Sequence, residues 1–282
     1  MSKTVIAAVD NTAAAGPVID TALSIASIFG ADVEAVHVRE DGVTTVTALA
    51  KAAKVPLRLL EGPPAQTLIG ALRDSPTLLG VLGIRRTAAG HHPIGHIVLD
   101  VVQHANRPVV AVPPQSGPRI PRPLRRLLVP LDGTAVAANA VDEMVQQLCE
   151  CGVQVLALHV FDAERVPRFS DQPQHEVEVW EREFLARYCR QPGTRLHTRR
   201  GWASSAVLEV ATAEHADMIA LGWAQDLSPG KAAVVRDVLR KATVPVILLP
   251  LSEQPGIGTA IRPADVGTAG PGRSATSRLS SG

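Results

Sequence analysis

An aspartate follows the first apolar run in each half of the chain, where its carboxylate could bind a ligand or order the next turn. Asp10 and Asp132 each come after five residues without a charge and lie 122 positions apart. A glycine, Gly83 or Gly222, follows a later apolar run in each half. Glycine lets backbone N–H groups approach an anion, and a following helix N-terminus adds partial positive charge. A carboxylate near such a loop suits a nucleotide, although an aspartate at this place can also cap the next helix.

The composition argues against several classes of partner. Lys and Arg number 28 against 27 Asp and Glu, so a net charge of +1 supplies no long-range attraction for nucleic acid or a membrane surface. Three cysteines among 282 residues fit a reducing compartment. The first apolar run is too short for a signal peptide, and no long uncharged apolar stretch predicts a membrane span. We expect a cytoplasmic protein with neither a nucleic-acid nor a membrane partner.

The chain contains an internal repeat, because five landmarks recur in the same order in both halves. The landmarks and their counterparts are Asp10 and Asp132, His37 and His159, Gly62 and Gly201, Gly83 and Gly222, and Pro108–Pro113 and Pro245–Pro250. Their offset is 122 for the first two pairs, 139 for the next two and 137 for the last. One insertion and one small deletion therefore align the halves, which predicts two copies of one domain.

Short apolar runs alternate with helical periodicity in both halves. Strands are predicted at 3–9, 33–38, 55–60, 77–82 and 108–112, and again at 126–131, 153–160, 195–199, 217–221 and 245–249. Helices are predicted at 14–29, 43–53, 64–74 and 95–105, and at about 174–190 in the second half. The strands are continuous apolar runs, as in parallel sheets covered on both faces. The predicted class is α/β, with two open, doubly wound parallel sheets, each in a three-layer α/β/α sandwich.

Composition also predicts the boundaries of the domains. We expect a first domain at 1–114, a proline-rich linker at 115–124, and a second domain at 125–250. Of the 32 residues from 251 to 282, 21 are Gly, Pro, Ser, Thr or Ala, and none is aromatic. Such a segment buries too little apolar surface to offset its ordering entropy, so we expect a disordered tail.

Several segments in each half together carry a family resemblance. They are Val9-Asp10-Asn11-Thr12 and Leu131-Asp132-Gly133-Thr134, Val36-His37-Val38 and Leu158-His159-Val160, Glu61-Gly62-Pro63-Pro64 and Arg200-Gly201-Trp202-Ala203, and the segment 95–109. Over roughly residues 3–113 and 125–250, the chain resembles tandem universal stress protein (UspA-like) domains. The resemblance implies a Rossmann-like fold of the adenine nucleotide alpha-hydrolase-like group. It also implies pairing of the last strands, at 108–113 and 245–250, as an internal pseudo-dimer, with a homodimer left open.

The resemblance implies ATP as a ligand of the first domain. The implied binding residues are Asp10 at the adenosine, Val38 at the base through its backbone, and Gly83, Arg86, Gly95 and His96 at the phosphates or ribose. The chain departs from the family's ATP-binding loop, Gly-x2-Gly-x9-Gly-Ser/Thr, because Arg86 replaces its second glycine and His96 its hydroxyl residue. The second half departs further. There Ala232-Ala233 stands in place of Gly-Ser, and Trp223 could fill or line the pocket.

The expected function is that of a stress-response regulator that binds an adenine nucleotide or an unidentified protein partner. No residue pattern indicates a general base, a nucleophile or a metal site, so we expect no catalytic activity. The histidines near the first loop lack cysteine or carboxylate ligands at a suitable spacing. Two alternatives remain: a ligand-free interaction module with vestigial pockets, and an enzyme of the wider adenine-nucleotide group.

Overall fold

The computed structural model describes residues 3–39, 42–74, 76–84, 95–114, 123–161, 173–228 and 231–251. Three predictions fall wholly or largely outside these ranges: the role of Arg86, the linker at 115–124 and the tail beyond residue 251. Among the described helices, none has both the length and the apolar character that a membrane span requires.

The predicted order of strands and helices is confirmed in both halves. The first half contains β1 (Thr4–Ala8), α1 (Ala15–Phe29), β2 (Asp32–Val38), α2 (Thr44–Ala53), β3 (Leu57–Leu60), α3 (Pro64–Arg73), β4 (Thr77–Gly83), α4 (His96–His104) and β5 (Val109–Val112). The second half contains β6 (Arg126–Pro130), α5 (Ala135–Glu150), β7 (Gln154–Phe161), α6 (Pro173–Tyr188), β8 (Arg195–Arg200), α7 (Ala203–Ala213), β9 (Met218–Trp223), α8 (Ala233–Lys241) and β10 (Val246–Pro250).

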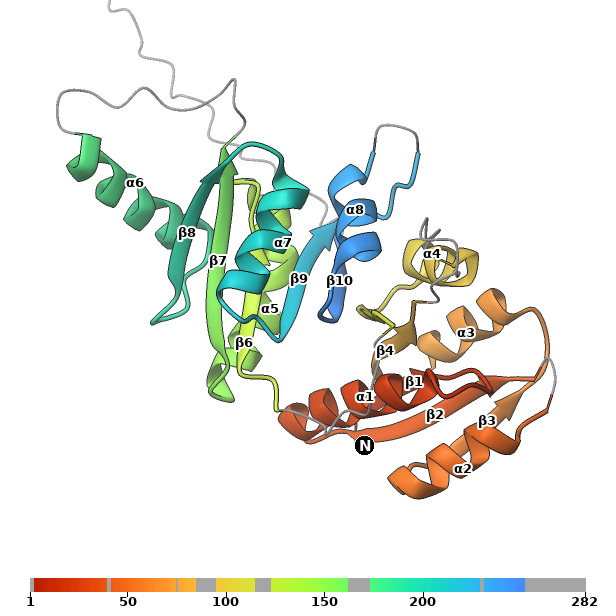
Figure 1. The fold of residues 1–282 in the computed structure, drawn as a ribbon. Coiled ribbons are helices and arrows are strands. Elements are labelled where there is room, and N and C mark those ends of the chain that lie inside the picture. The colour runs from red at the N-terminus through yellow and green to blue at the C-terminus, as the bar shows by residue number, and fades with distance from the viewer. Residues whose placement is uncertain are drawn as a thin grey trace, which may run out of the picture. The chain divides into compact units, whose positions relative to one another are not determined.

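The described strands form one ten-stranded sheet in the order β3-β2-β1-β4-β5-β10-β9-β6-β7-β8 (Figure 1). Each half repeats the doubly wound order, with all pairs inside a half parallel. The halves meet at β5 and β10, which pair antiparallel with Val110 opposite Ile247. The sequence-based prediction that these two last strands lie together is confirmed.

Helices cover both faces of the sheet because strand residues alternate between two buried clusters. Val5 and Ala7 pack with α1 and α2 on one face, whereas Ile6 packs with α3 and α4 on the other. The second half follows the same rule: Leu127 packs with α5, and Leu128 with α7 and α8. The strands therefore read as continuous apolar runs, and the predicted α/β/α layering is confirmed.

Candidate functional site

The candidate site of the first half lies where β1 and β4 end. From β1 the chain winds to β2 and β3, and from β4 it winds to β5 on the opposite side. The carboxyl ends of β1 and β4 are therefore the switch point at which open α/β sheets bind ligands. The sequence-predicted residues reach this edge: Asp10 follows β1, Val38 ends β2, Gly83 ends β4, and Gly95 and His96 begin α4. Arg86 lies outside the described residues.

The Asp10 carboxylate orders the turn that follows β1. Its Oδ1 accepts hydrogen bonds from the N–H and the hydroxyl of Thr12, at 3.2 and 2.6 Å. Asp132 repeats this arrangement with Thr134, at 2.8 and 2.7 Å. In the second half the N-cap of α5 is Thr134, whose hydroxyl accepts from Ala137 N–H. The alternative that these aspartates cap the next helix is thus corrected: the carboxylate positions a threonine instead.

A histidine side chain contacts the backbone just after the first strand of each half. The Nδ1 of His37 lies 2.8 Å from the carbonyl oxygen of Val9, and His159 repeats the contact with Leu131 at 2.8 Å. A carbonyl can only accept, so Nδ1 carries the proton and donates. His37 is buried, and its Nε2 has no hydrogen-bond partner among the described residues. His37 thus belongs to the core, and the half-buried His159 makes the same carbonyl contact.

Beside this contact, the backbone of Val38 has no partner on β1. Val9 N–H donates to Val36 O, and Arg39 N–H donates to Leu60 O. Backbone groups alternate in direction along a strand, so the N–H and C=O of Val38 face β1. The next ladder bond would join Val38 N–H to Val9 O, yet that oxygen accepts from His37. Within the described chain, no protein group bonds the N–H or C=O of Val38 on that side.

The N-terminus of α4 has no side-chain cap within the described part of the chain. Its N-cap is Gly95, no described side chain bonds the first N–H groups, and the first turn holds no acidic residue. His96, the first helical residue, is exposed. Backbone N–H groups in this state, together with the helix dipole, favour an anion.

Gly83, the last residue of β4, and Gly222, the next to last of β9, lie where a helix packs closely against the strand. A Cβ on Gly83 would lie 3.1 Å from a methyl group of Val18 on α1, and one on Gly222 would lie 3.1 Å from Ala137 O on α5. Helices α1 and α5 thus approach the strands too closely for a side chain. This role is sufficient to explain both glycines without a ligand.

The second half fills the corresponding region with aromatic rings. The His159 ring lies 4.9 Å from Phe161, 5.4 Å from Trp180 and 4.8 Å from Phe184, measured between ring centroids. Trp223, which the sequence left as filling or lining a pocket, is 4% exposed and belongs to the core beside α7 and α8. The sequence predicts the helix that carries Trp180 and Phe184 but not that Phe161 and His159 contact their rings.

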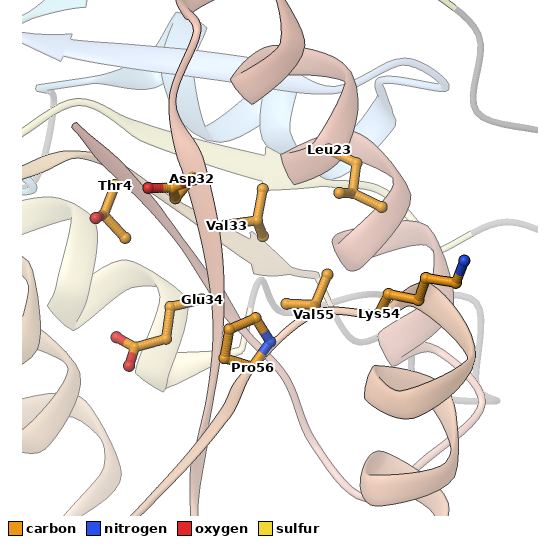
Figure 2. A pocket seen from close by; sticks show the side chains of 8 residues that line it. All are labelled: Thr4, Leu23, Asp32, Val33, Glu34, Lys54, Val55 and Pro56. Carbon is orange, nitrogen blue, oxygen red and sulfur yellow. The ribbon is translucent and has the colours of Figure 1, made fainter. Parts of the chain in front are cut away.

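A pocket lies at the opposite, amino-terminal edge of the sheet (Figure 2). It is an open pocket of about 430 Å³, lined by Thr4, Leu23, Asp32, Val33, Glu34, Lys54, Val55 and Pro56. Its charged groups do not converge, because the Lys54 amine points away from the carboxylates of Asp32 and Glu34. Glu34 is already paired with Arg58 at 3.2 Å. The pocket therefore lacks a set of polar groups that could orient a ligand.

Metal ligands are not gathered anywhere in the described part of the chain: no three His, Cys, Asp or Glu side chains are arranged to hold an ion. Two of the sequence's clustered histidines, His91 and His92, lie outside the described ranges.

Comparisons with known proteins identify the fold. Residues 123–250 match the family model of the Universal stress protein family. A universal stress protein from Archaeoglobus fulgidus is 16% identical and covers 88% of this chain and 98% of its own, with a TM-score of 0.64. A putative universal stress protein from Pseudomonas aeruginosa is 14% identical and covers 88% and 92%, also with a TM-score of 0.64. No curated protein matches the sequence.

Proposed function

We propose that this chain is a stress-response regulator that binds an adenine nucleotide. Residues 123–250 match the family model of the Universal stress protein family, and the two halves share one fold. The proposed ligand is ATP, and the proposed site is the carboxyl edge of β1, β2 and β4. The proposal includes two domains, residues 1–114 and 125–250, of which the first holds the nucleotide.

The observation that carries the proposal is the open backbone of Val38. One residue presents an N–H donor and a C=O acceptor side by side, as in a hydrogen-bonded pair of antiparallel residues. The edge of adenine offers the complement, with the amino group as donor and the adjacent ring nitrogen as acceptor. Only 8% of Val38 is exposed, and a buried peptide group without a partner is costly. A bound base would satisfy both groups.

The remaining parts of a nucleotide find matching groups along the same edge. The uncapped N-terminus of α4, with Gly95 and His96, suits the phosphates. Asp10 follows β1, which lies between β2 and β4 in the sheet, and its carboxylate is proposed to bind the ribose hydroxyls. Arg86 is proposed to contact phosphate through its guanidinium.

The first half is the better candidate because the second half has changed. The rings of Phe161, Trp180 and Phe184 surround His159. Ala232, at the N-cap of α8, has a φ of 51° that glycine adopts more easily. We therefore propose a single nucleotide site per chain. These same features favour the second candidate function, an interaction module that uses no ligand.

Calorimetric titration with ATP and with GTP tests the proposal. Guanine reverses the donor and acceptor at this edge, so both groups of Val38 would meet like partners, and GTP should bind about a hundredfold more weakly. Val38→Pro removes the N–H that faces the base, while the bond of Arg39 to β3 remains. Val160→Pro makes the same change in the second half and should leave ATP binding unaltered.

Each result has a distinct meaning. Binding of ATP that is lost in Val38→Pro but retained in Val160→Pro supports the site. Equal binding of ATP and GTP contradicts the role of Val38 in reading the base. No heat at millimolar ATP would favour the ligand-free interaction module.

A further inference from the structure

The two outer strands of the sheet differ in how their arginines are neutralised. On β3, Arg58 lies 3.2 Å from Glu34 and 3.3 Å from Asp74. On β8, Arg195, Arg199 and Arg200 are exposed, and none of them forms an ion pair with another residue in the described ranges. Strand β8 therefore presents positive charge that no ion pair among the described residues balances.

The backbone of β8 is also open on one side. Strand β8 is the last in the sheet and pairs only with β7 (Figure 1). Gly201 N–H donates to Phe161 O, so odd-numbered residues of β8 direct their backbone groups to β7. The N–H and C=O groups of Leu196, Thr198 and Arg200 consequently point to the free edge, where an added strand could bond them. Of these groups, the C=O of Thr198 already accepts a hydrogen bond of 2.8 Å from the Arg199 guanidinium.

An exposed tryptophan lies two residues after this strand, at the N-cap of α7. Trp202 is 86% exposed, although it is one of the largest apolar side chains in the chain. Its counterpart in the repeat is Pro63, the N-cap of α3. Charged residues alone would be explained as protection of an edge against aggregation. A fully presented indole has the opposite effect, since tryptophan favours association and is enriched at the centres of interfaces.

We propose that this β8 edge, residues Arg195–Arg200 with Trp202, binds an extended acidic segment of a partner protein as an additional strand. The backbone groups of Leu196 and Arg200 and the N–H of Thr198 supply the ladder, and the arginines pair with Asp or Glu side chains at alternating positions of the segment. Trp202 covers an apolar residue at one end of it. This interaction is separate from the nucleotide site.

A polypeptide fits the β8 edge better than a single-stranded nucleic acid does. Nucleic-acid binders stack successive bases on several aromatic side chains, whereas only Trp202 is offered here in the described second half. The outward backbone N–H and C=O groups of β8 would not help to bind successive phosphates, but they are complementary to those of another strand.

The test uses the full chain and a fluorescent peptide of alternating Glu and Val, with a Lys and Val peptide and an oligothymidine as comparisons. Fluorescence anisotropy measures binding. Trp202→Ala should weaken binding of the acidic peptide about thirtyfold. Thr198→Pro should weaken it as well, because it removes an outward N–H and leaves the bonds to β7 intact. Arg199→Glu should weaken it more than Lys51→Glu, which makes the same charge change on an exposed position of α2.

The altered positions are exposed or lie on the free edge, so circular dichroism should show unchanged folding. Binding of the Glu peptide that these variants reduce, with little binding of the Lys peptide, supports the proposal. It is overturned if the Glu peptide does not bind at millimolar concentration, or if Trp202→Ala and Thr198→Pro bind it normally. Preferential, variant-sensitive binding of oligothymidine would also overturn it, in favour of nucleic acid.

Discussion

The side-chain amide of Gln225 donates a hydrogen bond of 2.7 Å to the carbonyl oxygen of Ala105. It donates a second, of 3.0 Å, to Val102 O. Both carbonyls belong to the C-terminal end of α4, whose last backbone acceptors lack partners within the helix. A residue of the second half thus caps the helix whose N-terminus forms part of the first-half candidate site.

Replacing Gln225 tests whether the two ends of α4 are coupled. Gln225→Ala removes both bonds and should lower the free energy of unfolding by about 1–2 kcal/mol. Amide hydrogen exchange should increase in the last turn of α4, and ATP should bind more weakly because the helix is less firmly positioned. Gln146→Ala is the control, since Gln146 bonds only Glu150 on the exposed face of α5. Unchanged exchange in α4 would show that the cap has no such effect.

The left-handed conformation of Ala232 offers a test of stability. Its φ of 51° and ψ of 27° are unfavourable for a residue with a Cβ. Ala232→Gly should raise the free energy of unfolding by about 0.5–1 kcal/mol, because relief of strain exceeds the greater entropy of the unfolded glycine. Urea unfolding measures this difference. Ala233→Gly, one position later inside α8, should be neutral or destabilising, and the same gain at both positions would contradict the explanation.

The sequence predicts the elements and the edge that carries the site because these depend on local patterns. The apolar runs bounded by Asp10 and Gly83 predict the ends of β1 and β4 to within two residues of the observed ends. Polar contacts between distant segments leave no such pattern. Asn11, for example, accepts hydrogen bonds from the N–H groups of Thr45 and Val46 and so caps α2 from another loop. Gln225 is a second case, because its partners lie 120 and 123 positions away.

The candidate site likewise has one part that the sequence predicts and another part that depends on contacts between distant segments. Asp10 and Val38 are placed by strand order alone, which the repeat reveals. The open N–H of Val38 accompanies a hydrogen bond from the His37 ring to the carbonyl oxygen of Val9. Hydrophobic periodicity carries no information about such a side-chain contact. Trp223 could not be assigned from sequence because a tryptophan after a buried strand fits the core and a pocket equally well.

The cysteines should react in the order of their exposure and acidity. Burial raises the pKa of the Cys189 thiol and also that of Cys149, which decreases their thiolate fractions near neutral pH. Cys151 is exposed. Iodoacetamide at neutral pH should therefore modify Cys151 first and Cys189 last, as mass spectrometry of timed samples would show.

The pH dependence of this labelling follows from the sign of the pKa shift. A raised pKa moves the onset of Cys189 reactivity to higher pH than that of an unfolded thiol. The native state also loses stability as the pH rises above the ordinary thiol pKa of 9.0, because the unfolded chain ionises first. Labelling of Cys189 as fast as Cys151 at neutral pH would contradict its burial.

Replacing His37 separates the fold from the proposed recognition of the base. His37→Phe keeps a planar ring but removes the donor to Val9 O. That oxygen can then accept the N–H of Val38, which closes the ladder and occupies the donor proposed for adenine. We expect a folded protein, destabilised by about 1–2 kcal/mol, that has lost most of its affinity for ATP. His159→Phe makes the same change in the second half, where the ring packs against Phe184, and should retain ATP binding. Equal ATP affinity in both variants and the unaltered protein would show that the backbone of Val38 does not read the base.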